Sequence, residues 1–128
     1  MKKTKKSVKK SILKICDDLW SKLIKILAWF RCEHCWRTDH LNSHHIFSRI
    51  NYTTRFDLDN GICLCAGCHT MSSKFSAHKT PIEFAEWIIE KRGQEWYDNL
   101  KKKSKETRDW DYEKVEKYLI EETKKLTE

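Results

Sequence analysis

Apolar side chains recur at helical spacing near the start of the chain. Between Val8 and Ile26 they follow one another in steps of three or four residues, the period of one face of an α-helix. Trp20, Ile24 and Leu27 widen this apolar stripe, so the helix is expected to pack on the rest of the protein. We therefore predict an amphipathic helix over residues 8–27. The stripe itself consists of Val8, Ile12, Ile15, Leu19, Leu23 and Ile26.

The middle of the chain has no such periodicity. Residues 31–70 hold most of the cysteines and histidines and are expected to be irregular, with short β segments. We place one strand near residues 42–47 and another near residues 61–64. A helix is expected to begin near Ala66 and to carry His69.

The last third of the chain is helical in pattern. In "TPIEF", Thr80 is expected to cap a helix, with Pro81 at the first helical position and Glu83 completing a capping box. Gly93 can end this helix. No internal repeat is visible. Two further helices are expected over residues 94–103 and 111–125.

The composition indicates one modest domain with a limited core. The chain has 128 residues, of which 39% are hydrophobic and 35% charged, and a chain of this size often needs a metal or disulfides for stability. The net charge of +7 lies entirely in residues 1–25, which hold nine lysines and two aspartates. A lysine-rich arm over residues 1–10 is expected, either as a contact to nucleic-acid backbone or as a solubilising tail.

No targeting or membrane segment is expected. There is no run of about 18 apolar residues, and Lys14, Asp17 and Asp18 interrupt the apolar stretch that a signal peptide would need. The two aspartates also disfavour a helix lying on an anionic membrane surface. We interpret the protein as intracellular, where six cysteines indicate metal binding before disulfides.

Four of the cysteines form two Cys-x-x-Cys pairs, in "CEHC" and "CAGC". Two such turns can point four thiolates at one ion, which predicts a structural zinc site with no open position for chemistry. Buried or redox-active thiols are the alternative. Cys63 and Cys16 are expected to be packing residues, and His34 and His40 to be surface residues. The predicted zinc ligands are Cys32, Cys35, Cys65 and Cys68.

The remaining polar residues form a recognisable order. The pair "HH" at positions 44 and 45 is followed by Asn60 and then by "CAGCH" at positions 65–69, and this order resembles the HNH endonuclease family. The resemblance covers residues 31–79. The segments "DDLWSKLIKILAWFRCEHC" and "RFDLDNGICLCAGCH" are also similar to phage-encoded members, including NinG-type recombination nucleases.

The resemblance implies a fold class and a division of the chain. The expected fold is a small α+β protein, in which a ββα-metal core is knit by the four-cysteine zinc and flanked by helices. The expected parts are a basic flexible arm at residues 1–10, an amphipathic helix at 8–30, the core at 31–79 and a helical region at 80–128.

The same resemblance implies a role for each site residue. His44 stands where many members have a metal-binding aspartate, and His45 matches the general base. Asn60 matches the asparagine that orients the loop and the base, and His69 matches the second ligand of one catalytic divalent metal. We do not expect His78 to be a ligand. Among Mg²⁺, Mn²⁺, Ni²⁺ and Zn²⁺, a neutral imidazole suits Mg²⁺ least.

These roles fit the hydrolysis of a phosphodiester. A neutral histidine can take a proton from water near pH 7, and a metal ion can stabilise the charge that develops on phosphate. The expected activity is nicking or cutting of duplex or branched DNA, with a second copy or a larger phage complex as further partners. A non-catalytic zinc module that binds nucleic acid or supports assembly is the alternative. Candidate phosphate contacts are Arg49, Arg55 and Lys74.

Overall fold

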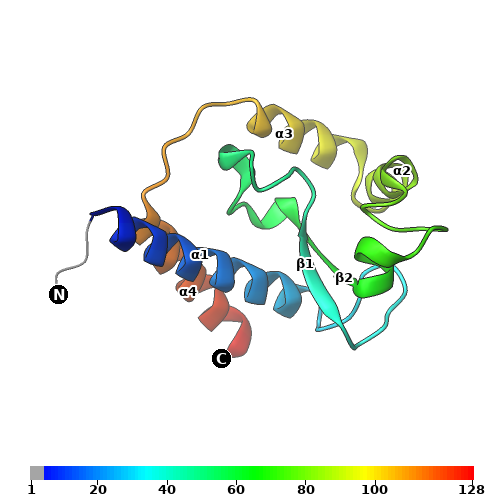
Figure 1. The fold of residues 1–128 in the computed structure, drawn as a ribbon, viewed down its shortest axis with the longest axis horizontal. Helices are drawn as coiled ribbons and strands as arrows, with labels where there is room; N and C mark the ends of the chain where they lie inside the picture. The colour runs from blue at the N-terminus through cyan, green and yellow to red at the C-terminus, as the bar shows by residue number, and fades with distance from the viewer. Residues whose placement is uncertain (1–4) are drawn as a thin grey trace.

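The computed structural model describes residues 5–128, and Figure 1 shows a small α+β protein built around one β-hairpin. Helices α1 and α4 lie side by side although they come from opposite ends of the chain, and α2 and α3 lie on the other side of the hairpin in this view. The predicted fold class is confirmed. The helices and strands are α1 (Lys5–Leu27), β1 (Leu41–His45), β2 (Gly61–Cys65), α2 (Pro81–Arg92), α3 (Gln94–Ser104) and α4 (Tyr112–Thr127).

The hairpin brings the candidate residues together. Strands β1 and β2 pair antiparallel, with Leu41 opposite Cys65 at one end and His45 opposite Gly61 at the other. The connection between them contains the short 3₁₀ helices η1 (Tyr52–Thr54) and η2 (Leu58–Asn60). Both strands were predicted to within two residues of their observed ends.

The helix predicted after β2 is much shorter than expected. It is a single π-helical turn, η3 (Gly67–Met71), which carries His69. Such turns are rare and are found disproportionately at functional sites. Lys74 therefore lies in the loop beyond this turn and not on a helix.

Helix α1 differs from its prediction at its start and in its buried face. It begins at Lys5 instead of Val8, so the backbone of residues 5–10 is helical, and the first part of the predicted basic arm, residues 1–4, lies outside the described residues. The stripe was expected to bury Ile15, which is exposed, whereas Cys16, Trp20 and Leu23 are fully buried. The buried face therefore keeps Leu23 of the predicted stripe and includes Trp20 and Ile24, which were expected only to widen it.

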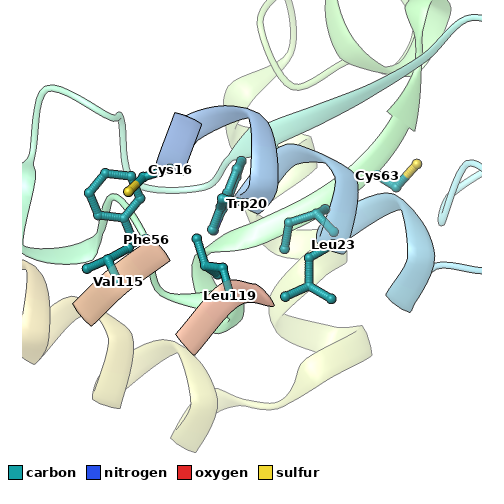
Figure 2. Close-up of a cluster of buried hydrophobic side chains, with 8 residues drawn as sticks. Cys16, Trp20, Leu23, Phe56, Cys63, Val115 and Leu119 are labelled. Atoms are coloured by element: carbon teal, nitrogen blue, oxygen red, sulfur yellow. The ribbon is translucent and has the colours of Figure 1, made fainter. Parts of the chain in front are cut away.

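The first core cluster lies between α1, α4 and the hairpin. Figure 2 shows side chains of α1 and α4 facing one another, with Phe56 at one end of the row and Cys63 at the other. Burial of this apolar surface is the main force that holds α1 against the core. The residues drawn include Cys16, Trp20, Leu23, Val115 and Leu119.

The second core cluster lies on the other side of β2, which is buried along its whole length. Ile62 and Leu64 join the second cluster while Cys63 joins the first, as strand alternation requires. At the end of the strand, Cys65 belongs to the second cluster and does not share the side of Cys63. Helix α2 contributes Phe84 and Ile88 to this cluster.

The start of α2 was predicted only in part. Thr80 occupies the N-cap position and Pro81 begins the helix, but no side chain caps it, so the capping box with Glu83 is wrong. Thr80 Oγ1 instead accepts a hydrogen bond from Ser76 N at 2.8 Å and donates one to Ser76 O at 3.0 Å. The cap residue therefore ties down the preceding loop. Among residues 5–128, no helix is long and apolar enough to cross a membrane.

Candidate functional site: a cysteine cluster and a histidine pocket

The four cysteines of the two Cys-x-x-Cys pairs converge. Their Sγ atoms lie within 4.8 Å of one another, and the Sγ atoms of Cys35 and Cys65 are 3.5 Å apart. Four thiolates placed about 2.3 Å from one zinc ion would be about 3.8 Å apart, so the cluster has the right size. All four are free thiols, which leaves them available as ligands. The predicted metal-binding cluster is confirmed, and its chemistry fits zinc.

Backbone N–H groups favour the thiolate form of one ligand of this cluster, Cys32. The N–H groups of Cys35 and Cys68 point at the Sγ atoms of Cys32 and Cys65, each at 3.5 Å. Burial raises the pKa of Cys32, but hydrogen bonds from nearby backbone N–H groups outweigh it and lower that pKa to about 7. The thiolate is the form that binds metal.

His34 is not the surface residue that the sequence suggested. Its ring stacks on Phe75 with centroids 3.7 Å apart, and its Nδ1 lies 3.3 Å from the Sγ of Cys68. A ring N–H can donate to a thiolate, so His34 supports the cysteine cluster from outside it. His40 is exposed, as predicted.

A second cluster consists of three histidines from three segments. His44 comes from β1, His69 from η3 and His78 from the loop before α2, and their candidate ligand atoms lie within 4.8 Å of one another. The Nε2 atoms of His69 and His78 are 3.2 Å apart. Nitrogen ligands about 2.0–2.1 Å from one ion lie about 3.0–3.4 Å apart, so this pair fits a shared metal.

His78 was not expected to be a ligand, but the structure places it in this cluster. Backbone hydrogen bonds from Ala77 N to Cys68 O at 2.9 Å and from His78 N to His69 O at 3.0 Å hold the loop against η3. This backbone pairing between the loop and η3 produces no periodic pattern in the sequence. The sequence signal that could have identified His78 as a ligand was a third histidine near a metal site with only two predicted ligands.

Two of the three histidines are held in the neutral form that binds metal ions. Burial, together with the charges that His69 and His78 would carry, lowers the pKa of His44 to about 3. Burial also lowers the pKa of His69. The rings of His44 and His69 are therefore neutral near pH 7. Three nitrogen donors leave coordination positions for other ligands.

His45 lies beside this cluster in a different environment. Its Nε2 is 3.1 Å from the carbonyl oxygen of Arg55. A carbonyl can only accept, so Nε2 carries the proton and the lone pair of Nδ1 remains free to accept one. Burial lowers the pKa of His45 despite the opposing effect of this hydrogen bond, which favours the neutral ring.

Helix α1 fixes the plane of the His45 ring. The indole of Trp20 stacks on the imidazole with centroids 3.8 Å apart and an interplanar angle of 9°. The Trp20 Nε1–H donates to Asp57 O at 2.9 Å, so the indole is itself held in place. A ring clamped on its face and at one nitrogen has little freedom to rotate.

Arg55 has a structural partner in place of the expected phosphate contact. Its Nε and Nη2 donate to the two carboxylate oxygens of Asp17 at 2.9 and 2.6 Å. The arginine side chain is only 10% exposed. This pairing argues against a role on DNA. It ties α1 to the residue whose carbonyl binds His45.

Asn60 is fully buried at the end of η2 and holds the loop that follows β1. Its Oδ1 accepts from Phe47 N at 2.7 Å, and its Nδ2 donates to Phe47 O at 2.9 Å and to Thr54 O at 3.1 Å. The two bonds to Phe47 hold the backbone two residues after His45. The bond to Thr54 holds the backbone next to Arg55, whose carbonyl binds His45. Asn60 thus holds the two backbone segments that flank His45 and makes no hydrogen bond to the His45 ring.

The histidines open on one pocket of about 670 Å³. His44, His45, His69 and His78 all line it, and Arg49 is an exposed cation in the same lining. Lys74 is exposed but does not line this pocket. Of the three basic residues predicted to contact phosphate, the geometry leaves Arg49 as the one beside the histidines.

Comparison with known proteins assigns a family to the central segment. Residues 32–75 match the family model described as HNH endonuclease. The match includes the four clustered cysteines, His44, His45, Asn60 and His69, and it leaves out α1, His78 and helices α2–α4. No match was found among the curated proteins or among the solved structures.

Proposed function

We propose that this chain, whose central segment is an HNH endonuclease domain, is a metal-dependent nuclease that hydrolyses phosphodiester bonds in DNA. The observation that supports this most is the placement of His45. Its ring is held in place with Nδ1 available, and the preceding residue, His44, belongs to a three-histidine cluster in the same pocket.

His45 acts as the general base. Its neutral ring accepts a proton from water at Nδ1, while Nε2 stays hydrogen-bonded to the Arg55 carbonyl. A positioned base of this kind contributes about 10²- to 10⁴-fold to the rate. Trp20 and Asn60 keep the ring and its loop in a fixed orientation, which matters because small misplacements of a base are costly.

His44, His69 and His78 hold one catalytic divalent metal. The bound ion supplies Lewis acidity to the phosphate and to the leaving oxygen. Three imidazole ligands favour Mn²⁺, Ni²⁺, Co²⁺ or Zn²⁺ over Mg²⁺, which prefers oxygen ligands. Arg49 contacts a phosphate at the edge of the pocket. The Cys32, Cys35, Cys65 and Cys68 site holds a structural zinc.

The substrate is duplex or branched DNA with little sequence preference. The pocket offers one cation and four histidines, which bind phosphate and metal and do not read base edges. One histidine pocket per chain makes one nick, so a double-strand break requires two chains or two successive events.

The test is nicking of supercoiled plasmid with each metal in turn. Wild-type protein is expected to nick with Mn²⁺, Ni²⁺ or Co²⁺ and not after removal of the divalent metal from the histidine site. His78→Ala should bind the added metal more weakly and lose activity. The control variant Tyr118→Ala, at an exposed aromatic residue on α4, should behave as wild type. Full zinc content and DNA binding without cleavage under every metal would favour a non-catalytic zinc module instead.

A further inference from the structure

Three large aromatic side chains face solvent in the segment that leads from α1 through the first Cys-x-x-Cys turn. Of the six tryptophans, Trp29 and Trp36 are the exposed ones, at 79% and 65%, and Phe30 beside them is 52% exposed. Leaving such rings in water gains nothing for folding, since tryptophan is normally buried to a large extent. We call residues 29–31, 36 and 37 the aromatic surface.

The backbone holds these rings outward. Trp29, Phe30 and Trp36 have φ values of 57°, 51° and 69°, in the left-handed region that costs an L-residue roughly 1–2 kcal/mol. The backbone N–H groups of the three residues donate to Ile26 O, Lys25 O and Cys32 O, each at 2.9 Å. Trp36 also follows Cys35 directly, so the zinc-binding turn fixes its position. The exposed rings are therefore built into a fixed backbone.

The aromatic surface is also positively charged. The Arg31 guanidinium lies 4.7 Å from the centre of the Trp36 ring, and Lys25 and Arg37 flank the segment. Glu33 is the sole carboxylate between residues 19 and 38. Its oxygens are already engaged by Arg92 at 3.3 Å and by the Cys63 N–H at 2.8 Å.

Asp39 reduces this charge only at one edge. It lies 3.6 Å from Arg37 and 3.9 Å from His40, and all three side chains are well exposed. Lys25 and Arg31 have no carboxylate facing them in any ion pair recorded among the described residues. The complementary partner therefore combines negative charge with flat aromatic faces.

We propose that the aromatic surface binds unpaired bases of a single-stranded DNA segment. Bases in a duplex are stacked on one another and cannot present their faces, whereas unpaired bases stack on tryptophan at about 1–3 kcal/mol per base. Arginine and lysine would take up the phosphates between them. The inference rests on the proposed function in one respect, since it treats the bound single strand as part of the nuclease substrate. It favours branched DNA or single-strand–duplex junctions over plain duplex as that substrate.

The aromatic surface continues toward the histidine pocket. Arg37 and His40 share a shallow pocket of about 500 Å³ with Gly67 and Met71 of η3, the turn that also carries His69. Met71 is itself 66% exposed. A strand bound at Trp36 thus lies beside the element that contributes a histidine to the nuclease site.

The experiment measures binding of a fluorescein-labelled oligo(dT) by anisotropy, with no divalent metal added so that no cleavage occurs. Trp29→Ala and Trp36→Ala should each raise the Kd at least about 5-fold, the equivalent of one stacked base. Arg31→Ala should also flatten the salt dependence of the Kd. The matched control is Tyr118→Ala, an exposed aromatic on α4, which should leave the Kd unchanged. Zinc content and circular dichroism confirm that each variant is folded, and Trp36→Tyr should retain most of the affinity.

Three results would overturn the proposal. One is an unchanged Kd for oligo(dT) in the Trp29→Ala, Trp36→Ala double variant. Another is an equal loss of affinity for a blunt duplex of the same length in the same variants. The third is a wild-type dimer that these substitutions dissociate, since the rings would then bind a second copy. Plasmid nicking by wild type separates the two proposals. Cleavage together with an unchanged Kd in the tryptophan variants would refute only the role of the aromatic surface. A Kd that depends on the tryptophans, without any cleavage, would refute only the nuclease activity.

Discussion

Replacing Asp17 by asparagine tests how α1 supports the candidate base. The Asp17 carboxylate binds Arg55 through two hydrogen bonds, and the two side chains are 27% and 10% exposed. Asp17→Asn removes the charge and one acceptor while keeping the shape, and it leaves a nearly buried guanidinium without a counterion.

The expected loss follows from this burial. Breaking a fully buried pair costs about 3–5 kcal/mol, and partial access of water to Asp17 reduces this to about 2–3 kcal/mol. For a chain of this size the melting temperature should fall by roughly 10 °C. The Arg55 carbonyl that holds His45 should also shift, so the nicking rate should fall about 10-fold at a temperature where the variant is folded.

The neighbouring acid supplies the matched control. Asp18 pairs with Lys14 on the same helix, but these side chains are 67% and 76% exposed, so Asp18→Asn should change stability by less than about 1 kcal/mol. Thermal and denaturant unfolding, followed by circular dichroism, compares the two variants. Equal stability of Asp17→Asn and Asp18→Asn would refute the argument from burial.

Three further changes probe other parts of the structure. Chelating the metal of the four-cysteine site should unfold the hairpin, because structural zinc contributes about 10 kcal/mol or more of binding free energy to small modules; near-UV circular dichroism would detect this, and an unchanged melting curve after zinc release would contradict it. Gly61→Ala should destabilise by about 1–3 kcal/mol, because the new Cβ would lie 2.8 Å from Trp20 Cζ2 and closer still to Ile24, whereas Gly67→Ala meets only one atom at 3.9 Å. Burial raises the pKa of Asp57, and its Oδ2 has no hydrogen-bond partner among residues 5–128. The folded state therefore binds this proton more tightly than the unfolded state does, and the carboxylate destabilises the fold above its folded pKa. Asp57→Asn should therefore raise the melting temperature at pH 7.5 and lose this advantage near pH 3.5; a lower melting temperature at pH 7.5 would refute the assignment.

The sequence was sufficient to predict the features that depend on the spacing of nearby residues. Steps of three and four residues located α1, and Pro81 and Gly93 set the limits of α2 because each acts on its own backbone. The two Cys-x-x-Cys pairs predicted the metal-binding cluster, since two short turns suffice to gather four thiolates.

What the sequence did not show depends on contacts between segments that share no sequence pattern. Arg55 was assigned to DNA because its partner Asp17 lies 38 residues away, and no local pattern shows that pair. His78 was left out because backbone bonds to η3, and not sequence spacing, bring it to His69. The support of His45 by Trp20 was likewise invisible, as both residues only looked like members of their own elements.

The most direct test of the central claim is the single-turnover nicking rate of His45→Ala beside wild type. Zinc content and binding of the catalytic metal are measured on both proteins, and His45→Asn serves as a second variant that better fills the space beneath Trp20. The account predicts a rate lower by about 10²- to 10⁴-fold with both metals retained. A His45→Ala protein that nicks within a few-fold of wild type would contradict the assignment of His45 as the base.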